Sequence, residues 1–179
     1  RTLATETGAQ SGATGNLGAN RADTGNGADQ KPLKFPAAKL GEILVAEDII
    51  TKGELERALE HKRAQGGFLG QALMDLDILD QQTLTTFLVK QCKIPHLSLD
   101  DYSIDASMAS IAPAEICEKY GILPIDKMGK ILTVAMVDPL DREAMDAATE
   151  AAPELQIKAI HGDWRDFDRA FKTLFPHKK

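Results

Sequence analysis

Two consecutive stretches of similar sequence decide how this chain folds. The first is KLGEILVAEDIITKGELERALEHK, residues 39–62, and the second is FLGQALMDLDILDQQTLTTFLVKQ, residues 68–91. Overlaid at an offset of 29 residues, they are identical at seven of 24 positions. Self-similarity of this kind marks a supersecondary unit that occurs twice. The identical pairs are Leu40/Leu69, Gly41/Gly70, Leu44/Leu73, Asp48/Asp77, Ile49/Ile78, Leu55/Leu84 and Leu59/Leu88.

Each copy is predicted to consist of a helix, a tight connection and a second helix. In the first copy Leu40 and Leu44 recur at helical spacing, and Thr51 with Glu54 three residues later is typical of a capping box. In the second copy Asp80 can cap a helix that carries the leucines of the repeat. Neither copy can close a core alone, so we expect the two copies to stack.

The repeated glycines are the feature that core packing does not explain. Glycine inside a helix costs about 1 kcal/mol relative to alanine. Gly41 and Gly70 occupy the same place in both copies, which indicates close approach of the backbone to another helix or to a ligand. Both interpretations stay open here, and helix packing is the commoner use.

After Pro95 the pattern changes to that of a small α/β module. A short helix is predicted from about residue 113 to Gly121, and strands over 122–125, 131–137 and 155–160. Helices over 142–152 and from residue 164 should follow the second and third strands, so these two strands should be parallel. The expected fold class is α+β: an N-terminal all-helical tandem repeat followed by a small three-stranded α/β module.

The first 34 residues differ from the rest of the chain. They contain six glycines and no aromatic residue, and such a segment cannot bury enough apolar surface to offset its ordering entropy. We therefore expect a disordered tail over 1–34, a tandem helical repeat subdomain over 35–95 and a small α/β subdomain over 96–179.

Composition and charge exclude several classes of protein. With 43% hydrophobic and 27% charged residues among 179, the chain resembles a globular protein. No apolar run approaches the ~20 residues of a membrane span, so no direct membrane insertion is expected. The net charge of -6 disfavours a broad surface for DNA or RNA. Two cysteines make no disulfide framework, and no secretory signal is visible, so we predict a cytoplasmic location.

No catalytic constellation is visible in the sequence. Gly129 and Lys130 stand without the other residues of a phosphate-binding loop, and no serine or cysteine has an identifiable base. The chain is therefore predicted not to be an enzyme and to require no cofactor.

No metal site is predicted either. Cys92 and His96 lie four residues apart, but Pro95 lies between them and no second pair follows, so we interpret them as a buried thiol beside a loop histidine. His161 follows a strand end, where α/β sites often lie, but Asp163 is interpreted as a helix cap.

The two copies and the later strands resemble a known family. The runs Lys39–Val45, Cys92–Leu99, Tyr120–Ile125 and Leu132–Asp141 are similar to the N-terminal domain of type II secretion and type IV pilus assembly ATPases, the MshE N-terminal domain class. The resemblance covers about residues 37–175. It implies that some members bind cyclic di-GMP between the tandem motifs. Other members dock the ATPase onto the cytoplasmic part of an inner-membrane assembly protein.

The nucleotide motif of the family is only partly present. It begins Arg-Leu-Gly, has a second glycine seven positions after the first, and ends in Gln. Lysine keeps the charge of the initial arginine but loses its planar fork, whereas phenylalanine can stack but cannot neutralise phosphate. The second copy is also net acidic, which disfavours an anionic ligand. The departures are Lys39 and Phe68 at the arginine, Asp48 and Asp77 at the second glycine, and Lys62 at the first glutamine; Gln91 is retained.

The resemblance implies two functional hypotheses. The first is a non-catalytic regulatory and docking module of a type II secretion or type IV pilus assembly system, which binds an inner-membrane platform protein or an assembly ATPase. The alternative is a cyclic di-GMP receptor, and a third possibility is a stand-alone adaptor. We expect Lys39, Arg57 and Lys62, with Phe68 and Gln91 across the seam, to form the binding surface. The implied nucleotide-binding set is Lys39, Leu40, Gly41, Leu44, Leu55, Leu59, Lys62, Phe68, Leu69, Gly70, Leu73, Leu84, Leu88 and Gln91.

Overall fold

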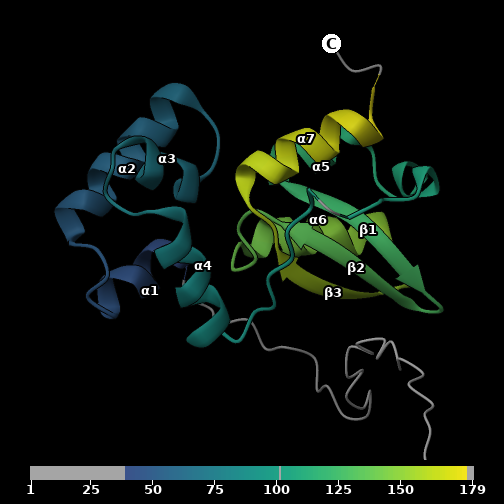
Figure 1. Ribbon diagram of the computed structural model, residues 1–179, viewed down its shortest axis with the longest axis horizontal. Helices are drawn as coiled ribbons and strands as arrows, with labels where there is room; N and C mark the ends of the chain where they lie inside the picture. Colours follow the sequence, from purple (N-terminus) through teal and green to yellow (C-terminus); the bar gives the residue numbers. More distant parts are fainter. Residues whose placement is uncertain (1–38, 101, 177–179) are drawn as a thin grey trace, which may run out of the picture. The chain divides into compact units, whose positions relative to one another are not determined.

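A computed structural model describes residues 39–100 and 102–176 of the chain (Figure 1). The predicted tail over 1–34 lies outside the described residues. The predicted fold class is confirmed, because four helices precede a three-stranded sheet with its own helices. None of the helices in the described ranges combines the length and apolar character needed to cross a bilayer.

Both copies of the repeat fold as a short helix followed by a longer one. Thr51 is the N-cap of the second helix: its hydroxyl accepts from the Glu54 N–H at 3.2 Å, and the Glu54 carboxylate accepts from the Thr51 N–H at 2.7 Å. The predicted capping box is thus confirmed, and Asp80 caps the fourth helix through the Thr83 N–H at 2.8 Å. The helices are α1 (Leu40–Ala46), α2 (Lys52–Gln65), α3 (Leu69–Asp75) and α4 (Gln81–Lys90).

In each copy, the connection between the two helices contains one residue whose backbone has a left-handed conformation. Asp48 has φ 55°, and the N–H groups of Asp48 and Ile49 donate to the carbonyls of Val45 at 3.1 Å and Leu44 at 2.9 Å. This is a Schellman motif, which normally places glycine at the left-handed position. Asp77 has φ 53° and the same pair of hydrogen bonds. The two copies therefore share backbone geometry as well as sequence.

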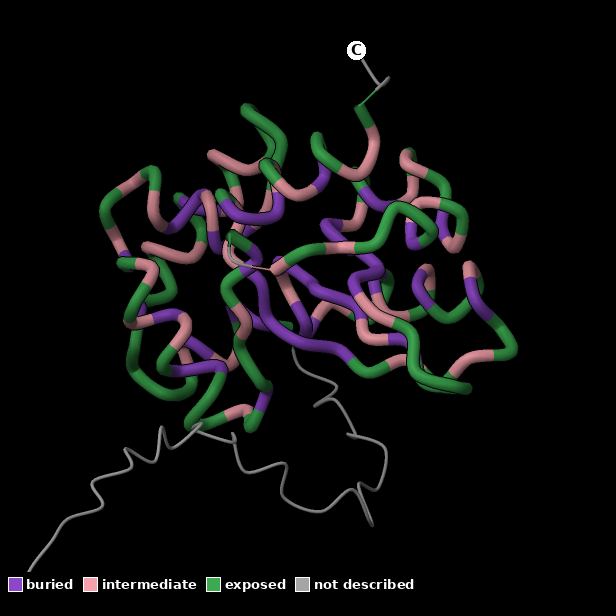
Figure 2. Tube along the Cα trace, turned by 45° about the vertical axis from the view of Figure 1, so that its right-hand side comes forward, coloured by how far each residue is buried: buried purple, intermediate pink, exposed green. Residues whose placement is uncertain are grey.

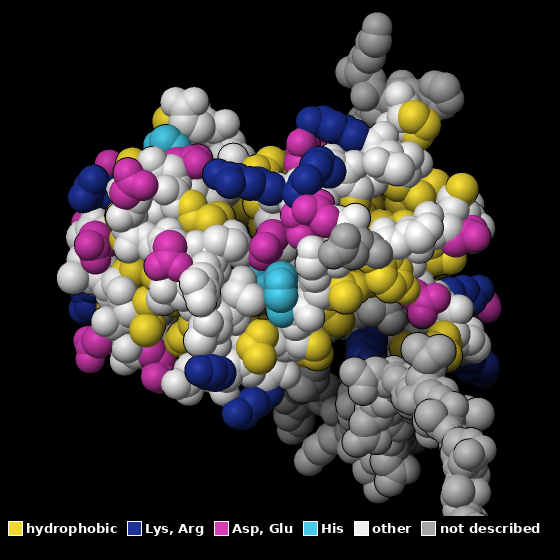
Figure 3. All heavy atoms as spheres, viewed as in Figure 1, with side chains coloured by type: hydrophobic (Ala, Val, Ile, Leu, Met, Phe, Trp, Pro, Cys, Tyr) yellow, Lys and Arg dark blue, Asp and Glu magenta, His cyan; other side chains and the backbone are white. Residues whose placement is uncertain are grey.

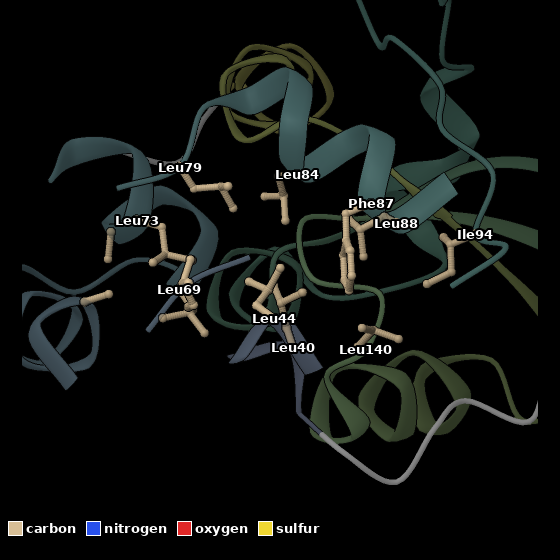
Figure 4. Packing of buried hydrophobic residues seen from close by; sticks show 13 residues of the cluster. Leu40, Leu44, Leu69, Leu73, Leu79, Leu84, Phe87, Leu88, Ile94 and Leu140 are labelled. Atoms are coloured by element: carbon tan, nitrogen blue, oxygen red, sulfur yellow. The ribbon is translucent and has the colours of Figure 1, made fainter. Parts of the chain in front are cut away.

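One apolar cluster joins the four helices of the repeat (Figure 4). It also contains Leu140, which belongs to the Asp-Pro-Leu-Asp turn after the second strand. The core of the repeat therefore includes a residue that lies far along the chain. The buried members labelled in Figure 4 are Leu40, Leu44, Leu69, Leu73, Leu79, Leu84, Phe87, Leu88, Ile94 and Leu140.

The C-terminal half contains the predicted three-stranded sheet, in the order β1-β2-β3. The first two strands form an antiparallel hairpin, and β2 pairs with β3 in parallel, as expected. A short 3₁₀ helix before α5 was not predicted. The elements are η1 (Ala106–Ser110), α5 (Ala114–Tyr120), β1 (Ile122–Met128), β2 (Ile131–Met136), α6 (Arg142–Ala151), β3 (Gln156–His161) and α7 (Trp164–Leu174).

The sheet is covered on both faces. Val134 and Met136 of β2 share a cluster with Ala144 of α6, whereas Ala135 shares a cluster with Phe167 of α7. Successive side chains of a strand point to opposite faces, so the continuous apolar run of β2 is buried from both sides. Figure 2 shows buried residues along much of the strands.

Candidate functional site

Gly41 and Gly70 are buried, and each faces a leucine of the following helix. A Cβ atom built on Gly41 would lie 2.5 Å from Cδ1 of Leu55, and one built on Gly70 would lie 3.1 Å from Cδ2 of Leu84. Leu55 and Leu84 are equivalent positions of the two copies. Of the two uses left open by the sequence, the structure therefore shows close packing of helices at both glycines.

The two Leu-Gly pairs also meet each other. A Cβ atom on Gly41 would lie 3.1 Å from Cδ2 of Leu69, the residue before Gly70. The apolar residues of the implied nucleotide-binding set thus form one continuous core, and the glycines lie beneath leucine side chains. The residues of this set in the repeat core are Leu40, Leu44, Leu69, Leu73, Leu84 and Leu88, with Leu55 and Leu59 partly buried against them.

Phe68, which replaces the second-copy arginine, packs against the α/β half. Its ring centroid lies 5.3 Å from that of Trp164 and 6.5 Å from that of Phe167, both in α7. It also covers Gly121, where a Cβ atom would lie 2.6 Å from Cζ of Phe68. The ring is therefore part of an aromatic cluster and cannot stack on a nucleotide base without leaving it.

The basic residues of the expected surface have different surroundings. Lys39 and Arg57 are exposed, and the Lys39 N–H donates to the Glu42 carboxylate at 3.2 Å. Lys62 is half-buried and lies close enough to Asp138 to favour its ionised form. Desolvation nevertheless raises the pKa of the Asp138 carboxyl to about 6. Lys62 therefore faces the Asp-Pro-Leu-Asp turn.

Gln91 lines a surface hollow of about 340 Å³ in which residues of both copies meet. The first copy contributes Ile49, which is 37% exposed, and the second copy contributes one side of α4. Val89 of α4 is 39% exposed. We call this surface the seam hollow; its lining residues are Ile49, Gln82, Thr83, Thr86, Phe87, Lys90 and Gln91.

Charges of both signs are interspersed on the face of the molecule that Figure 3 shows. The seam hollow likewise combines one lysine with amide, hydroxyl and apolar side chains. Such a surface suits a protein partner better than a polyanion, because a polyanion requires clustered cations.

Comparison with known proteins finds a family model that is similar to the C-terminal half of the chain. Residues 92–179 match the model of the MshEN domain. The type IV pilus assembly ATPase PilB of Myxococcus xanthus is 34% identical over 110 residues, which are 62% of this chain and 19% of PilB. The chain thus spans about a fifth of the length of that relative.

Two solved structures resemble both halves of the chain. MshE with cyclic di-GMP has a TM-score of 0.58 and 27% sequence identity, and the match covers 76% of this chain and 99% of that chain. The N-terminal domain of XpsE has a TM-score of 0.56 over 81% of this chain and 97% of that chain. At 14% identity, the XpsE match shows the fold alone.

Proposed function

We propose that this chain is a non-catalytic regulatory and docking module of a type II secretion or type IV pilus assembly system, because residues 92–179 match the MshEN domain model. Its partner is a protein of the assembly machinery in the cytoplasm, either an inner-membrane platform protein or the assembly ATPase itself. The observation that best supports this proposal is the seam hollow, where Ile49, Lys90 and Gln91 remain accessible while the motif leucines and glycines are committed to the core.

The proposal that the module is non-catalytic rests on the relatives and on the sequence. The chain spans 19% of PilB and contains no complete phosphate-binding loop. ATP hydrolysis in such a protein would therefore be carried out by another region, and this module would control or position that region.

Binding energy at the seam hollow would come mainly from its apolar side chains. Partly exposed Ile49 loses water-accessible area when a partner covers it, whereas Lys90 remains at the rim. Buried apolar contacts at an interface centre supply most of the affinity, and rim charges set orientation and association rate.

Cyclic di-GMP binding is the second candidate function, and two observations favour it. MshE was solved with cyclic di-GMP, and the paired Gly-Leu packing of this chain is intact in both copies. Against it stand Lys39 in place of arginine and the commitment of Phe68 to the aromatic cluster with Trp164.

Isothermal titration calorimetry of the full chain distinguishes the two candidates. We expect no heat of binding when cyclic di-GMP is titrated at micromolar concentration, and we expect binding of the cytoplasmic part of a platform protein or of an assembly ATPase. Cyclic di-GMP binding at micromolar affinity or tighter would establish the receptor alternative if it is lost in Lys39→Ala and Gln91→Ala. It must also persist in Lys130→Ala, which removes an exposed lysine of the β1–β2 turn.

A further inference from the structure

We propose that His96, His161 and Asp163 form a binding site for a divalent transition-metal ion of the zinc class. Each residue offers one ligand atom, and the three atoms lie within 4.8 Å of one another. His96 belongs to the linker after α4, His161 is the last residue of β3, and Asp163 directly precedes α7. The sequence did not predict this site, since 65 residues separate the two histidines.

The backbone holds the two imidazoles side by side. His96 and His161 form an isolated parallel bridge: the His161 N–H donates to the Pro95 carbonyl at 2.7 Å, and the Leu97 N–H donates to the His161 carbonyl at 3.1 Å. The ring centroids are 5.3 Å apart with an interplanar angle of 39°. Two ligands of the site are thus positioned by main-chain hydrogen bonds before any ion binds.

His161 is a buried histidine without hydrogen-bond partners. It is 1% exposed, and neither ring nitrogen has a partner within the described ranges. Backbone groups of Met136 and Val137 favour its charged form, but neither reaches hydrogen-bond geometry. A neutral imidazole has a free lone pair, which is what a metal ion requires.

His96 has the hydrogen bond that is typical of a metal-bound histidine. Its Nδ1 lies 3.1 Å from the His161 carbonyl oxygen. A carbonyl only accepts hydrogen bonds, so Nδ1 carries the proton and Nε2 carries the lone pair. Ligating histidines commonly donate their second ring N–H to a carbonyl, which fixes tautomer and orientation. His96 is also exposed, which gives an ion access from solvent.

Asp163 supplies the carboxylate. Its Oδ1 lies 3.6 Å from Nε2 of His161 and accepts a hydrogen bond from the Gln81 side-chain amide. Asp163 occupies the N-cap position of α7, but its side chain makes no capping hydrogen bond. The sequence therefore predicted the N-cap position of Asp163 correctly, but the expected capping hydrogen bond from its side chain is not formed. The neighbouring carboxylates of Asp100 and Asp166 are both paired with Arg169, at 2.6 Å and 2.8 Å, so Asp163 is the carboxylate left to face the imidazoles.

The donor set selects the class of metal. Two imidazoles and one carboxylate suit Zn²⁺, Co²⁺, Ni²⁺ or Cu²⁺, whereas Mg²⁺ and Ca²⁺ prefer oxygen ligands alone. Zn–N bonds of about 2.0–2.1 Å require the ligand atoms to come closer together than the 4.8 Å within which they lie here, so ion binding would draw the three side chains inward. Three protein ligands leave a fourth position open, and the bound ion would tie the linker to the start of α7.

The full chain, freed of metal with EDTA, provides the test. ZnCl₂ titrated by calorimetry should bind with one-to-one stoichiometry at micromolar affinity or tighter. CoCl₂ should give the visible absorption of a tetrahedral site with nitrogen ligands. His96→Gln and Asp163→Asn should each weaken Zn²⁺ binding by at least about tenfold. The matched control is His61→Gln, because His61 pairs with Asp75 at 3.6 Å in α2 and α3, and this variant should bind like the parent chain.

His96 and Asp163 lie outside the buried core, so the test does not depend on His161→Gln remaining folded. Zn²⁺ binding weaker than about 1 mM would overturn the proposal. Equal Zn²⁺ affinity of the parent chain, His96→Gln and Asp163→Asn would also overturn it, because the ion would then be held elsewhere.

Discussion

Gly41 lies directly under Leu55, so closely that a methyl group on the glycine would overlap the leucine side chain. An equivalent but less tight contact joins Gly70 and Leu84, 29 residues further along, where a methyl group on the glycine would lie 3.1 Å from Cδ2 of the leucine. The Leu-Gly pairs therefore form an equivalent helix–helix contact once in each copy. This contact determines which surfaces of the repeat are free to bind a partner.

Gly41→Ala should destabilise the chain even though alanine is the better helix former. Overpacking costs about 1–3 kcal/mol, which exceeds the ~1 kcal/mol gained in helix propensity. Urea unfolding should therefore show a net loss of about 1 kcal/mol in the free energy of unfolding. Gly53→Ala in α2 is the control, because a Cβ atom there meets nothing within 4 Å, and it should be neutral or stabilising. A Gly41→Ala chain as stable as Gly53→Ala would contradict the contact.

Asp48→Gly should stabilise the chain, whereas Asp48→Ala should destabilise it. Asp48 adopts φ 55°, and a left-handed conformation costs an L-residue roughly 1–2 kcal/mol, less for aspartate and nothing for glycine. We expect a gain of about 0.5 kcal/mol for glycine and a loss of similar size for alanine, measured by urea unfolding. If alanine proved more stable than glycine, the residue would not be left-handed in solution.

Phe68→Ala should lower the free energy of unfolding by about 2–3 kcal/mol, less than for a fully buried phenylalanine because Phe68 is half-buried. The loss arises because the ring packs on Trp164 and covers Gly121. The fluorescence of Trp164, which is the one tryptophan of the chain, should change at the same time. Unchanged stability and fluorescence would show that the Phe68 ring is free.

The stability of the chain should depend on pH through His161 and Asp138, whose pKa values shift in opposite directions on folding. The pKa of His161 falls from 6.5 to about 4 on folding, so the unfolded chain binds more protons between these values. Its contribution of up to about 3 kcal/mol is complete above pH 6.5 and is lost as the pH falls to 4. The pKa of Asp138 rises from 3.8 to about 6, so its contribution is greatest below pH 3.8 and is lost as the pH rises to 6.

These two effects nearly cancel in the parent chain between pH 4 and 6, and single substitutions should reveal them. The stability of Asp138→Asn should rise with pH over this range, and that of His161→Gln should fall. Urea unfolding at pH 4.5 and pH 6.5 measures both slopes. Parallel pH profiles of the two variants would contradict the assignment of the titrations to these residues.

The helices of the repeat, the caps at Thr51 and Asp80 and the positions of the three strands were predictable because their signals are local. Thr51 and Glu54 lie three residues apart, and the continuous apolar run of β2 is read within one strand. The left-handed backbone at Asp48 is also local, and the glycine that the family has at this position was its sequence signal.

The parts that could not be predicted depend on contacts between distant segments. Phe68 meets Trp164, and Leu140 enters the repeat core, although nothing near either residue in sequence indicates its partner. The same holds for His96 and His161, which only the pairing of the linker with the end of β3 brings together. Packing contacts of this kind decide which motif residues remain available for binding.

Measuring how a single charge in the seam hollow affects partner binding tests the docking proposal most directly. The matched pair is Ile49→Asp in the hollow and Ile131→Asp in β2, whose parent isoleucines are 37% and 43% exposed. Calorimetry with the cytoplasmic part of a pilus platform protein or with the assembly ATPase should show affinity reduced at least about tenfold by Ile49→Asp. Ile131→Asp should bind like the parent chain. Equal affinity of Ile49→Asp and the parent chain would contradict docking at the seam hollow.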